Sequence, residues 1–503
     1  MEMKTIKRKY ERDFIQFFLN GKLYKIKNIC PDTTLLEWLR ETIALTGTKE
    51  GCAEGDCGSC TVVIAQTNTN GDIFWKAINS CIAFLPMLDG TSITTIENVT
   101  YEDGELHPCQ SNMVANFGSQ CGFCTPGIIM STYAGWCQNI KWSAKNVERM
   151  LAGNLCRCTG YASIKRSCKN LSLYKRKEID AKRKEKELEH INTLNLTDSL
   201  DMKTKKCRWY APKSLRELTT HLNDFPMATI ISGSTDVGLW VTKKRKHIPH
   251  FISLQKIDAL KTISESKFHW EIGAGVTLAA FKEEVGKFNP DFDEVLSRFG
   301  SEQVRSQGTI GGNIANASPI GDLPPMLLAL NASITLQSKG GVRSIQLKDF
   351  FIRYGIQNRY PNEVLVSIKI PKLNKYSIFR AYKVSKRFDQ DISCVMAAFY
   401  IEIKNNIVAD IRLGFGGMAE IPKRATCVEK FLRKKSFTQA NIVKASAKFL
   451  MDFSPISDLR GSKEYRETSA KNLLTKWWLE IENSQYYRLS CDFSENQITR
   501  VRK

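Results

Sequence analysis

The sequence lacks any run of about 20 consecutive apolar residues, which a membrane-spanning helix would require. Its first residues, Met1 to Phe14, also lack the apolar stretch and the small-residue cleavage site of a secretory signal peptide. Acidic residues at Glu2, Glu11 and Asp13 disfavour an amphipathic transit peptide. No internal repeat is visible, which argues against a solenoid or a propeller. We therefore expect a cytoplasmic protein built from ordinary globular domains.

Negative charge is in short supply. The chain has 73 Lys and Arg against 52 Asp and Glu, a formal net charge of +21, which can attract nucleic acid or an anionic membrane. However, the densest basic stretch, Lys165–Glu187, is mixed with acidic residues and has a single aromatic residue, Tyr174. It thus lacks the base-stacking side chains typical of single-strand binders. We interpret the charge as lysine spread over solvated surfaces, and we expect neither a nucleic-acid nor a membrane partner.

Cysteine, by contrast, is plentiful. The chain has 503 residues, which at about 100–200 residues per domain predicts three or four domains. Twelve of its 16 cysteines lie between Cys30 and Cys168. In a reducing compartment, cysteines clustered in this way hold metal more often than they form disulfides.

The first part of the chain is predicted to be mostly β-structure. Phe14–Ile26 is typical of a hairpin that turns at Asn20-Gly21, a favoured two-residue turn. A helix is expected over Thr34–Thr42, and strands over Thr61–Ala65 and Ile93–Ile96.

The next part changes to helical spacing, over Leu106–Cys137 and Val147–Leu151. Pro126 suits the first turn of a helix and Gly153 suits a helix end. The charged stretch 173–205 follows and contains neither glycine nor proline. We interpret it as a linker that is helical in part.

From Cys207 to Pro371, short β runs alternate with helices and glycine-rich turns. Later segments predict strands and then helices, at Ala397–Ile403, Asp410–Phe415, Asn441–Phe453 and Glu464–Trp478. The expected domains are 13–98, 99–172, 206–373 and 376–483, with the linker at 173–205.

A first set of cysteines has the spacing of one metal centre. Cys52, Cys57 and Cys60 follow the pattern C-x4-C-x2-C, and Cys81 follows at a distance. Four thiolates in this arrangement hold the 2Fe–2S cluster of plant-type ferredoxins. Glycines in the loop let the backbone curl around a cluster and direct N–H groups at it; they are Gly51, Gly55 and Gly58. The alternative, a zinc ion, usually takes two close pairs of cysteines.

A second set consists of two pairs, Cys121 with Cys124 and Cys156 with Cys158, each expected near a helix end. Taken alone, this set is also compatible with zinc, but beside a ferredoxin-type loop we expect a second 2Fe–2S cluster. The other cysteines have no partner at a metal-binding spacing and are expected to be small buried hydrophobic residues: Cys30, Cys109, Cys137, Cys168, Cys207, Cys394, Cys427 and Cys491.

Two glycine-rich stretches follow β runs, at Ala228–Gly238 and Gly308–Asp322. Glycines at such turns let backbone N–H groups approach a pyrophosphate, and Ser234, Thr235 and Asn313 add hydrogen-bonding groups. Neither stretch is the G-x-G-x-x-G motif of a Rossmann fold. From the residues alone, ordinary turns between strands remain an alternative for both.

Four long motifs, GCAEGDCGSCTV, LHPCQ, SQCGFCTPG and GNLCRCTGY, resemble the xanthine dehydrogenase and aldehyde oxidase family of molybdenum hydroxylases. The resemblance covers nearly the whole chain outside the linker and the last residues. It implies a multidomain α+β protein with a β-grasp plant-type ferredoxin domain and an all-helical 2Fe–2S domain. These would precede an α+β FAD-binding domain and a small α/β C-terminal flavoprotein domain.

The resemblance also implies roles for single residues. Cys52, Cys57, Cys60 and Cys81 would hold the cluster on the flavin side, and Cys121, Cys124, Cys156 and Cys158 the cluster nearer the molybdopterin. Gln110 matches a glutamine that hydrogen-bonds the pterin in the family, and Cys158 would lie close to it. Ser59 departs from the more common alanine, a conservative change.

For FAD, the resemblance implies contacts from Ile230, Ile231, Ser232, Gly233, Ser234, Thr235, Asp236, Val237, Phe299, Thr309, Ile310, Gly311, Gly312, Asn313, Asp322, Leu365 and Lys383. Phe388-Asp-Gln-Asp is similar to the small-subunit form of the bacterial members, and the loop Val384–Ser393 would lie near the flavin edge. The alternative for that loop is a surface turn. Asp236, Tyr354 and Asp391 are hypothetical contacts on the nicotinamide side; no acid–base catalytic residue is expected.

The implied function is electron transfer from a molybdopterin site, where a purine is hydroxylated from hypoxanthine or xanthine to urate, through two 2Fe–2S clusters to FAD and on to NAD+. Because no molybdopterin domain follows Lys503, we expect a separate molybdopterin-binding large subunit and a dimer of such pairs. Alternatives are the corresponding subunit of an aldehyde, nicotinate or carbon monoxide oxidising enzyme, a free-standing electron carrier, and a zinc-binding scaffold.

Overall fold

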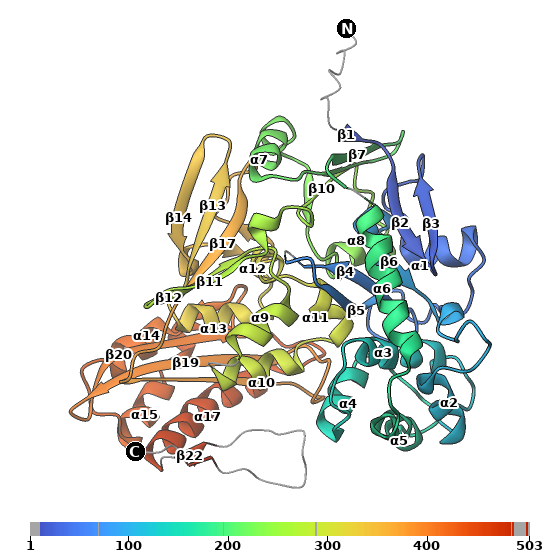
Figure 1. The fold of residues 1–503 in the computed structure, drawn as a ribbon. Coiled ribbons are helices and arrows are strands. Elements are labelled where there is room, and N and C mark those ends of the chain that lie inside the picture. Colours follow the sequence, from blue (N-terminus) through green and yellow to red (C-terminus); the bar gives the residue numbers. More distant parts are fainter. Residues whose placement is uncertain are drawn as a thin grey trace. The chain divides into compact units, whose positions relative to one another are not determined.

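The computed structural model describes residues 11–68, 70–194, 196–286, 289–483, 485–486 and 499–500. The chain divides into two compact units, drawn in Figure 1. The first consists of Met1–Ala259 with Ser301–Gly308, and the second of Leu260–Gly300 with Thr309–Lys503. In the described part of the chain, no helix is both long and apolar enough to cross a membrane.

The first unit begins with a mixed five-stranded sheet in the order β3-β2-β6-β4-β5. The predicted hairpin is confirmed, because Asn20 and Gly21 take left-handed φ values of 51° and 79° at its turn. The predicted helix over Thr34–Thr42 is also present, as α1 and the π-helical segment Trp38–Thr42 that continues it. The last strand begins one residue earlier than predicted, at Ser92, and ends at Thr94. The elements are β2 Ile15–Leu19, β3 Lys22–Ile26, α1 Leu35–Glu37, β4 Thr61–Thr67, β5 Ile73–Asn79 and β6 Ser92–Thr94.

Four helices follow: α2 Pro108–Ala115, α3 Thr125–Cys137, α4 Ala144–Leu151 and α5 Ala162–Lys169. The helical stretch predicted over Leu106–Cys137 is thus two helices, separated by the loop that bears the first cysteine pair. Pro126 lies in the first turn of α3, and Gly153 lies just past the end of α4, as predicted.

The charged stretch 173–205 is more than a spacer. Helix α6, Glu178–Thr193, confirms that it is helical in part, and β7, Ser199–Lys203, is a strand that was not predicted. Helix α6 lies against the first sheet, and Ile191 joins the core of the four helices. Because most of its residues are charged, the composition of this segment does not predict that α6 packs on the sheet.

A second five-stranded sheet has the order β1-β7-β8-β10-β9, with β1 Glu11–Arg12, β8 Arg208–Ala211, β9 Thr229–Ile231 and β10 His250–Ser253. Helices α7 Leu215–Asp224, α8 Val237–Thr242 and α11 Glu302–Gln307 complete the unit. The two sheets share one core, in which the rings of Phe84, Trp209 and Phe251 lie 5.4–6.2 Å apart. Phe84 belongs to the first sheet's part of the chain, and Trp209 and Phe251 to the second sheet, so this core joins segments that are distant in sequence. Burying a large apolar side chain stabilises a fold by about 1.5–3 kcal/mol.

The second unit contains an antiparallel five-stranded sheet in the order β11-β12-β17-β13-β14. Its strands are β11 Ile263–Glu265, β12 His269–Gly273, β13 Ser333–Ser338, β14 Gly341–Gln346 and β17 Val364–Pro371. The helices nearby are α9 Leu278–Val285, α10 Pro290–Arg298, α12 Ile310–Ala315 and α13 Leu323–Ala329, and β15 Phe351–Arg353 pairs with β16 Ile356–Gln357.

A four-stranded antiparallel sheet ends the second unit, with β18 Ser377–Val384, β19 Val395–Lys404, β20 Ile407–Gly416 and β21 Lys423–Arg424. The helix predicted over Asn441–Phe453 is two helices, because a turn at Ala447 and Lys448 interrupts it. The helices are α14 Thr426–Leu432, α15 Gln439–Ser446, α16 Phe449–Asp452 and α17 Lys463–Glu482. Two short strands, β22 Gln485–Tyr486 and β23 Thr499–Arg500, pair after them.

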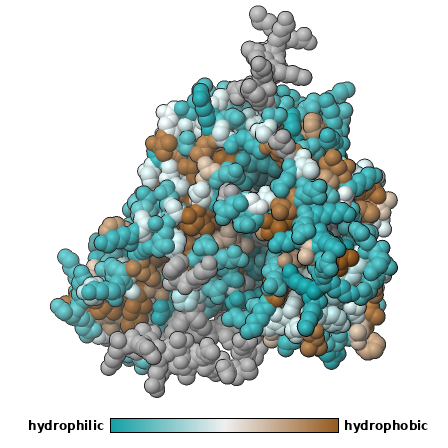
Figure 2. Space-filling view, viewed as in Figure 1, coloured by the Kyte–Doolittle hydropathy of each residue, from teal (hydrophilic) through white to brown (hydrophobic). Residues whose placement is uncertain are grey.

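The surface in view is largely hydrophilic, with small and scattered hydrophobic patches (Figure 2). Such isolated apolar residues are normal on a folded domain.

Candidate functional site: two cysteine quartets and the predicted flavin loops

The first cysteine quartet converges in the first unit. The thiol of Cys52 lies within hydrogen-bonding reach of Cys57 and Cys81, and that of Cys60 within reach of Cys81. Backbone N–H groups of Glu54, Asp56 and Cys57 donate to Cys52 Sγ at 3.3–3.4 Å. The neighbouring thiols of Cys57 and Cys81, together with these N–H groups, hold the pKa of the Cys52 thiol far below its usual value, while the same contacts raise the pKa of Cys57 and Cys81. The backbone of this loop therefore directs its donors at one sulfur, Cys52 Sγ.

The glycines of this loop are required by close approach. A Cβ at Gly51 would lie 2.8 Å from Cys57 Sγ, and one at Gly58 would lie 2.1 Å from the carbonyl oxygen of Gly153. Gly55 and Gly58 also have left-handed φ values of 76° and 72°, which favour glycine. The spacing-based expectation for these glycines agrees with the way the loop folds.

The second quartet lies among the helices. Cys124 lies at the N-cap position of α3, and its thiol is within hydrogen-bonding reach of Cys156. The sulfur of Cys158 lies 3.6 Å from that of Cys121 and 4.0 Å from that of Cys156. The backbone N–H of Cys156 donates to the Tyr161 hydroxyl at 2.9 Å. Although burial acts to raise it, hydrogen bonds from Thr159 lower the pKa of Cys156 to about 7. Both quartets predicted from the sequence are thus assembled.

The spread of the sulfurs fits a cluster of two metal ions better than one zinc ion. Four thiolates on one zinc lie roughly 3.8 Å apart, given Zn–S bonds of about 2.3 Å. Neither quartet contains three sulfurs that all lie within 4.8 Å of one another. The four thiolates of a 2Fe–2S cluster are shared between two irons and lie further apart. The residues therefore fit the predicted clusters.

A backbone hydrogen bond joins the loops that carry the two quartets. The N–H of Leu155, next to Cys156, donates to the carbonyl oxygen of Cys57 at 2.9 Å. Gln303, which is fully buried, donates from one amide nitrogen to Thr61, Ser131 and Asn154 at 3.1–3.2 Å. Gln303 was missed from the sequence, where a polar residue in a short helix carries no signal.

The stretch Ile230–Val237, predicted to contact FAD, turns from β9 into α8 in the first unit. Ser234 has a φ of 63° and donates its hydroxyl to the carbonyl oxygen of Ile82 at 2.7 Å. A Cβ at Gly233 would lie 1.9 Å from the carbonyl oxygen of Gln307. Lys243, just past α8, donates to the carbonyl oxygen of Cys52 at 2.7 Å. This stretch therefore contacts the segment that carries the first quartet, at Ile82, the residue next to Cys81.

The other predicted FAD contacts belong to the second unit. Thr309 caps α12 by accepting the N–H of Gly312 at 3.1 Å. Gly311 packs closely, because a Cβ there would lie 2.5 Å from that of Ala274. The Asn313 side-chain oxygen is buried and has no hydrogen-bond partner among the residues that the structure describes. An orphaned acceptor of this kind fits a bound ligand with donor groups.

Asp322 and Lys383 meet in a buried ion pair, with the lysine nitrogen 2.7 Å from the carboxylate. Ser393 donates to the same carboxylate at 2.5 Å and accepts from Lys383 at 2.8 Å. Leu365 lies in β17 and is 5% exposed, while Phe299 packs on the core of this unit. Because Asp322 and Lys383 satisfy each other, they fix where β18 meets α13.

The loop Val384–Ser393 is held by Arg298, a second residue missed from the sequence. Its guanidinium donates to the carbonyl oxygens of Phe388 and Lys383 at 3.1 and 3.0 Å, and lies 4.7 Å from the centre of the Phe388 ring. Asp391 accepts the N–H of Arg387 at 2.8 Å. Of the other hypothetical nicotinamide contacts, Tyr354 is 61% exposed in this unit and Asp236 is exposed in the first.

Gln110, predicted to face a pterin, completes a capping box at the start of α2. It accepts the N–H of His107 at 3.1 Å and bonds to the Thr100 hydroxyl. His107 is fully buried, and burial lowers its pKa. The LHPCQ motif thus shapes the helix end itself.

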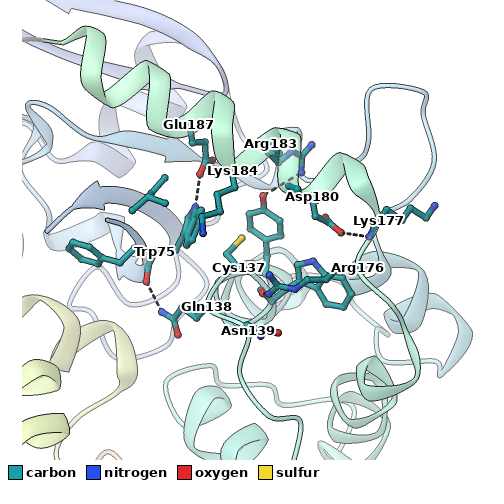
Figure 3. Close-up of a pocket in the computed structure, with 15 residues that line it drawn as sticks. Trp75, Cys137, Gln138, Asn139, Arg176, Lys177, Asp180, Arg183, Lys184 and Glu187 are labelled. Carbon is teal, nitrogen blue, oxygen red and sulfur yellow. Dashed lines mark hydrogen bonds between the residues drawn. The ribbon is translucent and has the colours of Figure 1, made fainter. Parts of the chain in front are cut away.

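A cavity of about 540 Å³ lies between β5, α3 and α6, lined by none of the predicted site residues. Figure 3 shows Arg183, Lys184 and Glu187 of α6 facing Trp75 and the end of α3. Glu187 accepts from the Trp75 indole, and Arg183 donates to the Tyr133 hydroxyl at 3.4 Å. The polar side chains that line this cavity bind one another, so we interpret the cavity as a packing gap between α6, β5 and α3.

The remaining cysteines only partly follow expectation. Cys109, Cys168 and Cys394 are buried, and Cys137 and Cys427 are half-buried, while Cys491 lies outside the described residues. Cys30 and Cys207, however, lie side by side, with 3.4 Å between their sulfurs. The sequence showed no partner spacing for this pair because 177 residues separate them; of the two, Cys207 is buried as expected and Cys30 is half-buried.

Four family models match consecutive parts of the chain. They are described as a 2Fe-2S iron-sulfur cluster binding domain at residues 17–85 and a 2Fe-2S binding domain at 95–169. An FAD binding domain in molybdopterin dehydrogenase matches 203–373, and a CO dehydrogenase flavoprotein C-terminal domain matches 380–481. The predicted iron–sulfur and FAD-binding character of the chain is confirmed.

Curated relatives agree. The chain is 31% identical to the xanthine dehydrogenase of Drosophila pseudoobscura pseudoobscura, over 92% of this chain and 39% of that protein. It is 32% identical to xanthine dehydrogenase 2 of Arabidopsis thaliana, over 84% of this chain and 36% of that protein. The chain therefore spans about two fifths of the length of these relatives.

Among solved structures, quinoline 2-oxidoreductase from Pseudomonas putida 86 matches with a TM-score of 0.51 and 27% identity, covering 56% of this chain and 99% of that chain. A Cu,Mo-CO dehydrogenase matches with a TM-score of 0.50 and 26% identity, covering 53% and 94%. The chain belongs to the molybdenum hydroxylase family, of which it represents the iron–sulfur and flavin part.

Proposed function

We propose that this chain conducts electrons from a molybdopterin centre, through the second and then the first cysteine quartet, to FAD in a xanthine dehydrogenase. When bound, the 2Fe–2S clusters supply one-electron transfer, and FAD links it to two-electron chemistry. The protein supplies position, burial and hydrogen bonds.

The observation that carries this order is the central place of the first quartet within the first unit. On one side, Cys57 accepts the N–H of Leu155, next to the second quartet. On the other, the carbonyl oxygen of Ile82 accepts from Ser234 of the predicted flavin stretch, and that of Cys52 accepts from Lys243 at the end of α8, the helix that follows this stretch. A cluster held by the first quartet would thus lie between the second quartet and the predicted flavin stretch Ile230–Val237.

The substrate, acceptor and partner extend this proposal. Relatives named xanthine dehydrogenase support xanthine or hypoxanthine as substrate and urate as product. NAD+ is the proposed acceptor, reached from the loop that Arg298 holds. We place the molybdopterin in a separate large subunit, in a cytoplasmic dimer of such pairs, because Phe388-Asp-Gln-Asp resembles the two-subunit bacterial form. Exposed Cys158 and half-buried Gln110 are the proposed contacts on that side.

A second candidate is the same electron-transfer role in a different molybdenum hydroxylase. The similarity to quinoline 2-oxidoreductase, at 27% identity, favours keeping it. Substrate choice would then be decided at the molybdopterin centre, and the residues described above would act in the same way.

The test is to purify the protein with its natural partners, quantify iron, zinc and FAD, and add xanthine with NAD+. We expect four irons (two 2Fe–2S clusters) and one FAD per chain, with xanthine-dependent formation of NADH. Cys57→Ser should lower the iron content by about half, whereas the matched Cys168→Ser, outside both quartets, should not. Full iron and FAD without a response to xanthine would remove the substrate but keep the electron-transfer role. Zinc without flavin would overturn both.

A further inference from the structure

Three side chains of types that can bind metal meet in the first unit, and none of them belongs to either quartet. The sulfurs of Cys30 and Cys207 are 3.4 Å apart, and a carboxylate oxygen of Asp32 joins them. All three ligand atoms lie within 4.8 Å of one another. In the described part of the chain, these residues form the one cluster of three or more such groups that is this compact.

Local structure brings the two ends of this cluster into position. Cys30 lies between β3 and α1, where buried Pro31 and a hydrogen bond of 3.0 Å from the N–H of Thr33 to the carbonyl oxygen of Cys30 form a tight turn. The turn places Asp32 beside Cys30. Cys207 closes the turn between β7 and β8, where its N–H donates to the Thr204 hydroxyl at 3.1 Å.

Burial and charge favour a cation at this point. Cys207 is 3% exposed, while Cys30 and Asp32 are half-buried, so the cluster opens to solvent on one side. Among the residues that the structure describes, no lysine or arginine forms an ion pair with Asp32. A carboxylate that lies beside two thiols without a counter-ion has a ready partner in a bound metal ion.

The donor set selects the metal. Thiolates are soft ligands that zinc accepts and that magnesium and calcium do not favour. Two sulfurs are too few for a 2Fe–2S cluster, which needs four protein ligands. A disulfide would need the two thiols alone, and the converging carboxylate would then have no role.

We propose that Cys30, Asp32 and Cys207 bind one zinc ion, with water in the fourth position. Binding releases the two thiol protons, so Zn²⁺ with two thiols and one carboxylate gives a complex of charge −1 and two H⁺. The ion connects the turn ahead of α1 to the β7–β8 hairpin. It thereby fastens the ferredoxin-like sheet to the sheet whose strand β9 leads into the predicted flavin stretch.

The test uses the whole protein with its clusters loaded, equilibrated with Zn²⁺ and then freed of unbound metal. We expect one zinc per chain beyond the cluster iron. Cys30→Ser and Cys207→Ser should lose it, and Asp32→Asn should weaken binding by more than the roughly 10–100-fold that follows loss of a ligand's hydrogen-bond partner. The matched control Cys168→Ser should keep the zinc, and iron content should be unchanged in all four variants.

A second measurement needs no variant. Zn²⁺ should protect Cys30 of the unaltered protein from alkylation by a maleimide, read by mass spectrometry of the peptides. Equal zinc in the Cys30→Ser variant, or alkylation of Cys30 that Zn²⁺ does not slow, would overturn the proposal. So would a disulfide between Cys30 and Cys207 in protein prepared without oxidant.

Discussion

Two glycines, Gly58 and Gly127, decide whether the segments that carry the two cysteine quartets can approach each other. A Cβ at Gly58 would lie 2.1 Å from the carbonyl oxygen of Gly153, and one at Gly127 would lie 2.2 Å from that of Gly58. Real Cβ atoms do not come this close to backbone. The hydrogen bond from Leu155 to Cys57 depends on this approach, so the contact between the two loops requires that both positions lack a side chain.

This leads to a prediction for Gly58→Ala. The new methyl group meets backbone, so we expect a loss of about 1–3 kcal/mol from overpacking, added to about 1–2 kcal/mol for alanine at a left-handed φ. Iron content should also fall. The two measurements are the free energy of unfolding in denaturant and the iron content per chain. Gly104→Ala is the matched control, because Gly104 has a φ of 85° with nothing within 4 Å of its Cβ position. Equal losses in the two variants would contradict the argument.

At this scale, the sequence predicted residues whose partners are close in the chain. Cys52, Cys57 and Cys60, with Gly51, Gly55 and Gly58, follow from a spacing within one loop, and each pair of the second quartet has a short spacing of its own. Gln303 lies 242 residues from Thr61, and Ser393 lies 71 from Asp322, so no spacing could announce them. Arg298 was missed for the same reason, since the loop it holds is about 90 residues away.

Among the elements, α6 shows how composition can conceal packing. Its residues are mostly charged, yet Glu187 is 8% exposed and accepts from both the Trp75 indole and the Thr94 hydroxyl. Arg183 donates to the carbonyl oxygens of Val99 and Thr100 at 3.2 Å. These contacts attach the helix to β5 and to the start of the helical region. A helix held by polar contacts on one face gives little apolar periodicity for a sequence to reveal.

Glu187 also makes the stability of this element depend on pH. Burial raises its pKa above the ordinary value of 4.5. The folded state therefore holds the proton more tightly than the unfolded state, and stability falls as pH rises from about 4.5 through the raised pKa.

We expect Glu187→Gln to reduce that fall, because glutamine can still accept from Trp75 and carries no buried charge. The measurement is the free energy of unfolding between pH 5 and pH 8, compared with that of the unaltered protein. Glu185→Gln, an exposed change on the same helix, should leave the pH dependence as it is. If both variants behave like the unaltered protein, Glu187 is not the source of the effect.

For the molecule as a whole, the order of regions along the chain differs from its division into units. The succession of iron–sulfur and flavin regions is predicted from motifs, because each motif is local. The units are not, since Ser301–Gly308 belongs to the first unit although the residues on both sides belong to the second. Buried Gln303 and Ser306 hold this segment, the latter through a 2.7 Å hydrogen bond to the carbonyl oxygen of Ala77. Nothing in the segment's composition indicates such long-range bonds.

Because both quartets and this segment share one unit, removal of iron should affect the units unequally. We expect hydrogen exchange to rise in the cluster loops and in 301–308, since Gln303 bonds to Asn154 and Thr61, which adjoin cluster ligands. Strands β19 and β20 have a separate core in the second unit and should keep their protection. The measurement is hydrogen exchange by mass spectrometry on iron-loaded and chelator-treated protein, with FAD content held equal. A uniform rise that includes β19 and β20 would show that the clusters stabilise the whole chain, and unchanged exchange at 301–308 would show that this segment is independent of them.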